Sequence, residues 1–181
     1  MYGLVNKAIQ DFVTREHGPE AWERIRVAAE VDVLEFVCMS PYPDDLTYRL
    51  VAAAADELAQ PAETVLEGFG EYWIRFSAEE GYGELMHMWG SSLEEFLGHM
   101  NDLHARISMV FPELRPPRIR CEALSDDMLA LHYESDRPGL APFVTGLLRG
   151  LGKRFGRALQ VHHDAARTAE AGHDVFLLHG V

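Results

Sequence analysis

The stretch SLEEFLGHMNDLHARISMVF, residues 92–111, is the most informative segment of this chain. Its apolar residues recur at steps of three and four, a spacing that places side chains on one face of a helix. Ser92 and Glu95 have the spacing of a capping box, which begins a helix. The pattern therefore predicts one continuous helix over residues 92–111. Its predicted inward positions are Leu93, Leu97, Met100, His104, Ile107 and Phe111.

His104 lies in the middle of this apolar face. A single histidine in such a place is more often a structural residue, neutral and bonded to a backbone carbonyl, than a ligand. For a ligand role the imidazole must be neutral, with one nitrogen open and the other held by a hydrogen bond. Asn101 or a backbone carbonyl is the predicted partner of that second nitrogen.

A second pattern favours the ligand role. In MLALHYESDR, residues 128–137, strand-like alternation places Tyr133, Ser135 and Arg137 on the inward face, at the end of an apolar row. An inward arginine needs an anion, because an unpaired buried charge loses its hydration. A bound carboxylate would accept hydrogen bonds from all three side chains. The alternative is a strand that ends in solvent, with Arg137 exposed.

A helical histidine followed by the motif Tyr-x-Ser-x-Arg, here Tyr133, Ser135 and Arg137, resembles the H-NOX (HNOB) family of haem nitric oxide and oxygen binding domains. The chain looks like the standalone bacterial type and is similar to the haem domain of soluble guanylate cyclase. The resemblance covers nearly the whole chain. Further similar segments are MYGLVNKAIQDFV, FGEYW, EEGYGEL, NDLHARI, FPELRPP and GLAPFVTGLLRGLGKRF.

The resemblance implies that the cofactor is haem b, iron protoporphyrin IX, with His104 as the iron ligand. The three motif residues would hold the haem carboxylates, and Pro117 would pack against a bent haem. The first helix, the helix with Trp73 and the helix over residues 140–155 offer apolar surfaces for the distal side of the pocket. The predicted lining residues are Val5, Ile9, Trp73, Phe143 and Leu147.

The position five residues after Arg137 is where oxygen-binding members of the family carry a tyrosine. Pro142 stands there, and neither Ala141 nor Phe143 has a donor in its side chain. A hydrogen bond to a polarised acceptor is worth roughly 1.5–3 kcal/mol, so its loss weakens a dioxygen complex by about tenfold to a hundredfold. We therefore predict a sensor of nitric oxide and carbon monoxide that binds dioxygen poorly. Trp73 is either plain core or a replacement donor.

Length, composition and charge limit the number of domains and the classes of partner. A chain of 181 residues with 48% hydrophobic content predicts one domain, residues 1–181, large enough to enclose a bulky cofactor. No long apolar run or signal peptide is visible, which predicts a cytoplasmic protein without a membrane span. The net charge of −13 argues against nucleic acid or an anionic membrane as a partner. Cys38 and Cys121 lack metal-ligand or disulfide-framework spacing.

The order of patterns predicts an α+β fold, with about seven helices in the first two thirds and a four-stranded antiparallel sheet at the C-terminus, enclosing the haem. His17-Gly18-Pro19 should end the first helix and start a second. A break at residues 81–83 should lead into a short helical segment that ends near Gly90. A hairpin starts at residue 118, with Ile119, Cys121 and Ala123 alternating on one face, and strands 158–163 and 174–179 follow, joined by a polar turn.

Further helices are expected from Pro43 to about Leu58, from near Pro61 through Phe76, and over residues 140–155. We interpret the C-terminal histidines as surface residues rather than a zinc site, because no cysteine lies beyond Cys121. They are His162, His163, His173 and His179.

Two other functions are compatible with parts of this sequence. A haem enzyme with peroxidase-like activity could use the same histidine, but the predicted distal surfaces lack a His–Arg or acid–base pair, so no enzymatic activity is expected. A cofactor-free interaction domain would be colourless. The chain carries no kinase, cyclase or methyl-accepting segment, so the expected partner is a separate protein. The family resemblance implies a histidine kinase or an enzyme that makes or degrades cyclic diguanylate.

Overall fold

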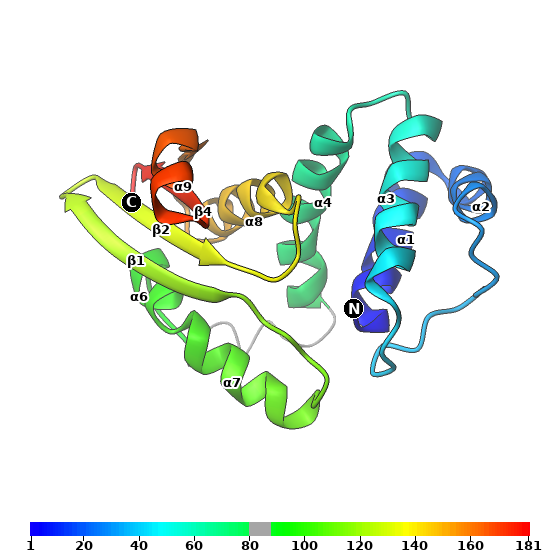
Figure 1. The fold of residues 1–181 in the computed structure, drawn as a ribbon, viewed down its shortest axis with the longest axis horizontal. Coiled ribbons are helices and arrows are strands. Elements are labelled where there is room, and N and C mark those ends of the chain that lie inside the picture. Colours follow the sequence, from blue (N-terminus) through cyan, green and yellow to red (C-terminus); the bar gives the residue numbers. More distant parts are fainter. Residues whose placement is uncertain (80–87) are drawn as a thin grey trace. The chain divides into compact units, whose positions relative to one another are not determined.

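The computed structural model describes residues 1–79 and 88–181 (Figure 1). The predicted break at residues 81–83 and most of the short helical segment after it lie outside the described residues. The chain divides into two units, Met1–Phe69 and Gly70–Val181. Among the described residues, no helix has both the length and the apolar character needed to cross a membrane.

The first unit is helical. Gly18, with a φ of 89°, separates the first two helices, and Pro19 opens the second, as the sequence predicts. Residues 31–43 are largely irregular. Fully buried Val13, Ile25 and Leu50 form much of the core of this unit. Its helices are α1 (Gly3–His17), α2 (Pro19–Ala28), α3 (Asp44–Glu57) and the first half of α4 (Ala62–Ser77).

The second unit combines helices with the predicted sheet. Its four antiparallel strands lie in the order β1-β2-β4-β3, so β2 and β4 are central. The fold class is thus the predicted α+β. The helices of this unit, besides the end of α4, are α6 (Leu93–Gly98), α7 (Met100–Val110), α8 (Ala141–Arg154) and α9 (Ala165–Ala171). The strands are β1 (Arg118–Ser125), β2 (Met128–Glu134), β3 (Gln160–His163) and β4 (Asp174–His179).

The predicted helix over residues 92–111 is wrong in its continuity, because it is two helices, α6 and α7. The Ser92 hydroxyl accepts from the Glu95 backbone N–H, as predicted. At His99 the backbone leaves the helical conformation (φ −95°, ψ 2°), and the ring Nδ1 lies 2.9 Å from the Trp89 carbonyl oxygen. This tertiary contact and the flexible Gly98 explain the break. The apolar pattern also missed Phe96 and Leu103, which are buried.

The hairpin of β1 and β2 has the predicted pairing, for example Ile119 opposite Tyr133. A register shift between Ala123 and Ser125 changes which residues face inward near the turn. The predicted inward position Ala123 is therefore exposed, whereas Leu124 is half-buried.

Strand β2 ends at Glu134, so the prediction that it continues through Arg137 is wrong. Ser135 and Arg137 lie in the turn that follows, where Pro138 cannot extend the ladder. The strict alternation also fails. His132 on the second face of β2 is only 7% exposed, because its ring contacts the side chains of His173 and Glu122.

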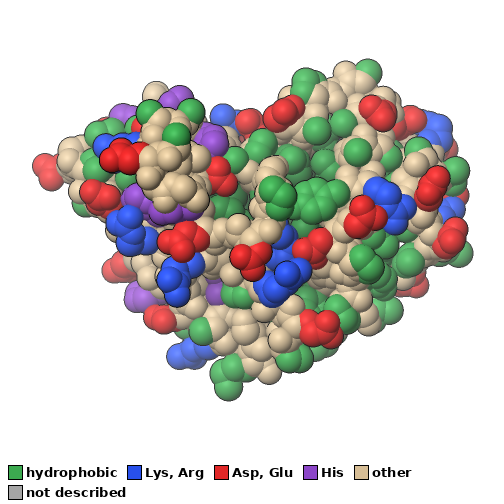
Figure 2. Space-filling view, viewed as in Figure 1, with side chains coloured by type: hydrophobic (Ala, Val, Ile, Leu, Met, Phe, Trp, Pro, Cys, Tyr) green, Lys and Arg blue, Asp and Glu red, His purple; other side chains and the backbone are tan. Residues whose placement is uncertain are grey.

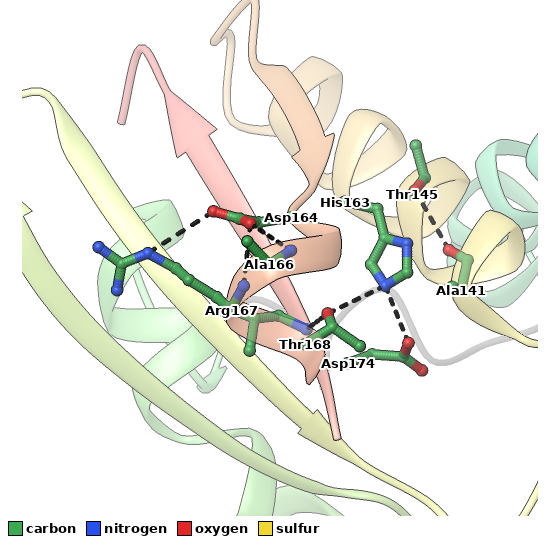
Figure 3. A network of polar contacts seen from close by, with 9 residues as sticks. Ala141, Thr145, His163, Asp164, Ala166, Arg167, Thr168 and Asp174 are labelled. Carbon is green, nitrogen blue, oxygen red and sulfur yellow. Dashed lines mark hydrogen bonds and ion pairs between the residues drawn. The ribbon is translucent and has the colours of Figure 1, made fainter. Parts of the chain in front are cut away.

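A helix, α9, occupies the place of the predicted polar turn between the last two strands (Figure 3). The Asp164 carboxylate accepts from the backbone N–H groups of Ala166 and Arg167 and so caps it. The Thr168 hydroxyl accepts from the Val175 backbone N–H and lies 3.3 Å from His163 Nε2. At seven residues, α9 is too short to be stable alone and depends on these contacts with β3 and β4.

Candidate functional site

A cleft of about 640 Å³ lies between α7 and the start of β1, and His104 lines it. Pro117 lines the same cleft, so the structure brings together the predicted ligand and the predicted packing proline. His104 is half-buried on α7, and its neighbour Leu103 is buried in the core.

The His104 ring is suited to bind a metal through a neutral nitrogen. Its Nδ1 atom is buried and has no hydrogen-bond partner within the described part of the chain. Burial lowers the pKa of His104 below its ordinary value of 6.5, and the backbone of Pro117 opposes that shift more weakly. The imidazole is therefore neutral at pH 7, the form that ligates metals.

Asn101 does not hold the imidazole, which corrects one of the two predicted partners. Its Nδ2 donates to the Ile119 carbonyl oxygen at 2.6 Å, and its Oδ1 accepts from the Ile119 N–H at 3.0 Å. The amide is thus engaged with β1 on both sides.

The three motif residues line a second cleft of about 640 Å³. Tyr133 is 7% exposed, at the end of β2. The Ser135 hydroxyl accepts from the Arg137 backbone N–H at 3.1 Å, and the Arg137 guanidinium donates to the Arg115 carbonyl at 2.7 Å. The motif is therefore a turn in which serine fixes the backbone that carries the arginine.

The two clefts adjoin, because Pro116, Arg118 and Glu134 line both of them. Arg118 brings a second guanidinium beside the motif, a residue that the motif search did not single out. The available signal was its position directly after Pro116-Pro117, where a stiff loop enters the strand.

Helices α4 and α8 are in close contact in the second unit (Figure 1). A Cβ added at Gly70 would lie 2.2 Å from the Phe143 carbonyl oxygen, so the two backbones touch there. Trp73 is half-buried, and its ring packs 6.2 Å from that of Phe76. Phe143 and Leu147 are half-buried on α8. Apolar side chains of both helices therefore remain partly uncovered within this unit.

Val5 and Ile9 belong to α1 in the first unit. Ile9 is 3% exposed and Val5 is half-buried. Their assignment to a ligand pocket stays a prediction.

Two of the C-terminal histidines, His163 and His173, contact other side chains, whereas His162 and His179 are exposed as predicted. His163 Nε2 donates to the Asp174 carboxylate at 2.9 Å (Figure 3), and His132 Nδ1 lies 2.9 Å from His173 Nε2. Histidine side chains gather around α9 on the face seen in Figure 2. Within residues 1–79 and 88–181, no three His, Cys, Asp or Glu side chains form a group that could hold a metal ion.

The family is decided by a direct comparison of sequences. The model of the haem-NO-binding (HNOB) family matches residues 2–163 of this chain. The chain belongs to this family. Among curated HNOB relatives, soluble guanylate cyclase gcy-35 of Caenorhabditis elegans is 35% identical over 158 residues, covering 86% of this chain and 23% of that protein. Soluble guanylate cyclase gcy-37 of the same species is 32% identical over 152 residues, covering 82% and 22%. The chain thus spans less than a quarter of the length of these two cyclases.

Solved H-NOX structures share the fold. A mutant H-NOX protein from Shewanella oneidensis in the Fe(II) state has a TM-score of 0.88 at 22% identity, covering 99% of this chain and 95% of that one. An H-NOX protein of the same species in the Fe(II)NO state has a TM-score of 0.86 at 21% identity, covering 98% of each chain.

The residues of this HNOB chain fit a haem. The His104 imidazole in its cleft offers a ligand for iron, and two guanidinium groups beside Tyr133 and Ser135 offer donors for carboxylates. The donor set is the one that iron and two acidic side groups require, and it occupies adjoining clefts.

Proposed function

We propose that this chain, a member of a gas-sensing haem domain family, is a sensor that binds nitric oxide and carbon monoxide at ferrous haem b and discriminates against dioxygen. The observation that carries the proposal is the neutral imidazole of His104 in a cleft that Pro117 also lines. Its Nδ1 is buried and lies near the Pro117 backbone, so Nε2 is the ring nitrogen left for a ligand.

His104 is the proposed iron ligand, and Tyr133, Ser135 and Arg137 are the proposed anchors for the haem carboxylates. Arg118 lies in the same cleft and adds a second positive charge to this anchor. Pro117 is the proposed contact for the haem ring. Val5, Ile9, Trp73, Phe143 and Leu147 are the proposed apolar lining.

Bound ferrous haem would supply an iron atom that coordinates a diatomic gas. What this chain contributes to selectivity is the lack of a donor at the start of α8. Pro142 occupies the first turn, and the Thr145 hydroxyl donates at 3.1 Å to the Ala141 carbonyl of its own helix. Without a donor at this position, dioxygen lacks a hydrogen bond that it needs more than nitric oxide or carbon monoxide does.

We also propose that His104 transmits the signal. Its helix, α7, is separated from α6 at His99, so release of the imidazole would let α7 move together with the sheet, to which Asn101 bonds it at Ile119. The motion would be detected by a separate cytoplasmic partner, a histidine kinase or an enzyme of cyclic diguanylate metabolism. The chain itself would act as a sensor without an enzymatic step.

Absorption spectroscopy of the ferrous protein tests this proposal. We expect a Soret band that shifts on addition of nitric oxide and of carbon monoxide and stays unchanged in air. A spectrum that changes stably in air would refute the selectivity, and Trp73→Phe would then show whether the indole is the donor. A protein that stays colourless after haem supplementation would refute the haem site itself. Peroxide turnover above that of free haem would refute the assignment as a sensor.

A further inference from the structure

Asn101 makes an unusual contact with the edge of the sheet. Strand β1 is an edge strand, so alternate backbone groups point away from β2. The Asn101 amide satisfies both backbone groups of Ile119, donating to its carbonyl at 2.6 Å and accepting from its N–H at 3.0 Å. The side chain thus replaces a peptide group of a neighbouring strand and fixes one point of α7 to one residue of β1.

This bond lies beside the His104 cleft. Asn101 precedes His104 by three residues, which places both on the same side of α7. Ile119 follows Pro117 by two residues, and all four residues line the same cleft. The amide therefore connects the helix that carries the proposed ligand to the segment that carries the proposed haem contact.

Apolar packing holds α7 against the core. Leu103 is the one buried side chain of α7, all of whose residues are described, and the half-buried Met100 and Ile107 pack against the same core. The break at His99 separates α7 from α6, so α6 does not impose its direction as a continuous helix would. Apolar packing is not directional, so the two hydrogen bonds of Asn101 are the contacts that relate α7 to one particular residue of β1.

We propose that Asn101 is a positioning residue that sets where His104 stands relative to Pro117, and thereby the geometry and strength of the iron–histidine bond. The inference rests on the proposed function, because it presumes that His104 binds iron. The effect of Asn101 can be distinguished from that of His104. Loss of Asn101 would change the geometry of the iron–histidine bond, whereas loss of His104 would remove the bond.

Three variants of the haem-loaded protein test the inference. Asn101→Ala removes both bonds to Ile119, and Asn101→Asp keeps the acceptor for the N–H but loses the donor to the carbonyl. Asp102→Ala is the matched control, since Asp102 is exposed on the same turn of α7. The first readout is the iron–histidine stretching band of the ferrous protein in resonance Raman spectra. The second is the rate of haem transfer to apomyoglobin.

We expect Asn101→Ala to shift the stretching band and to raise the haem transfer rate about tenfold, the usual scale for groups that orient a metal ligand. Asn101→Asp should lie between it and the wild type, and Asp102→Ala should match the wild type. If Asn101→Ala lowers only the thermal unfolding midpoint and leaves band and rate unchanged, the residue is merely structural and the inference is wrong.

Should circular dichroism show that Asn101→Ala does not fold, Asn101→Asp decides by the same two readouts. A wild-type protein without a Soret band would overturn the proposed function and this inference with it. A wild type whose haem depends on His104, with both Asn101 variants unaltered, would overturn the inference alone.

Discussion

Replacing Gly70 by alanine tests the contact between α4 and α8, the helices that carry Trp73 and Phe143. The new methyl carbon would lie 2.2 Å from the Phe143 carbonyl oxygen and 2.8 Å from the Leu147 backbone nitrogen. Both obstacles are backbone atoms, so no side-chain rotation relieves the overlap. The helices must separate by about 1 Å to restore ordinary contact distances.

Overpacking of this kind costs about 1–3 kcal/mol of unfolding free energy. For a chain of this size, each kcal/mol lowers the unfolding midpoint by roughly 2–4 °C, so we expect a decrease of about 2–12 °C. The matched control is Gly98→Ala at the end of α6, where an added Cβ meets nothing within 4 Å. That change should leave the midpoint equal or raise it, because alanine loses less backbone entropy than glycine.

Thermal unfolding followed by far-ultraviolet circular dichroism measures both variants. A midpoint for Gly70→Ala at or above the wild-type value, with the control behaving as expected, would refute the close approach of these two helices.

Four further predictions concern the site and the thiols. His104→Gly should lose its pigment and regain it when free imidazole is added, and an unchanged five-coordinate spectrum without imidazole would contradict the ligand assignment. Arg137→Ala should raise the haem transfer rate about tenfold. Arg137→Lys should give a rate between those of the wild type and Arg137→Ala, because lysine keeps the charge but not the planar guanidinium. Equal transfer rates in all three proteins would contradict the anchor role of Arg137. Burial lowers the pKa of His104, so a proton displaces iron only at pH values below the ordinary range of histidine: haem retention, measured by absorbance, should stay constant through that range and fall only at more acidic pH. Burial raises the pKa of Cys121 to about 11, so at pH 8 about one thiol in a thousand is ionised and iodoacetamide should leave it largely unmodified by mass spectrometry.

Local signals in the sequence were sufficient for several elements. Gly18 and Pro19 set the boundary between α1 and α2, because one permits a positive φ and the other has a fixed φ that suits a first helical turn. The Ser92 cap and the pairing of β1 with β2 followed from spacing alone. These features depend on residues that are close together in the sequence, so local sequence patterns are sufficient to predict them.

The candidate site was predicted residue by residue from the resemblance, and the structure places His104, Pro117 and the three motif residues in adjoining clefts, while their role in holding a haem stays a prediction. What the sequence could not show was the partner of each group. Asn101 bonds a residue eighteen positions away, and the Arg137 guanidinium donates to a carbonyl twenty-two positions away. Neither contact follows from periodicity, because backbone groups of distant segments meet only after the sheet and helices have packed.

The sequence by itself determined the kinds of elements, their order and the residue types that a haem would need. Tertiary structure alone decided that the helix of His104 begins afresh after His99, that β2 stops at Glu134, and that α9 forms at all. In each case the local preference is weak and a distant contact outweighs it: the Trp89 carbonyl at His99, the Arg115 carbonyl that accepts from Arg137 after β2, and the strands beneath α9.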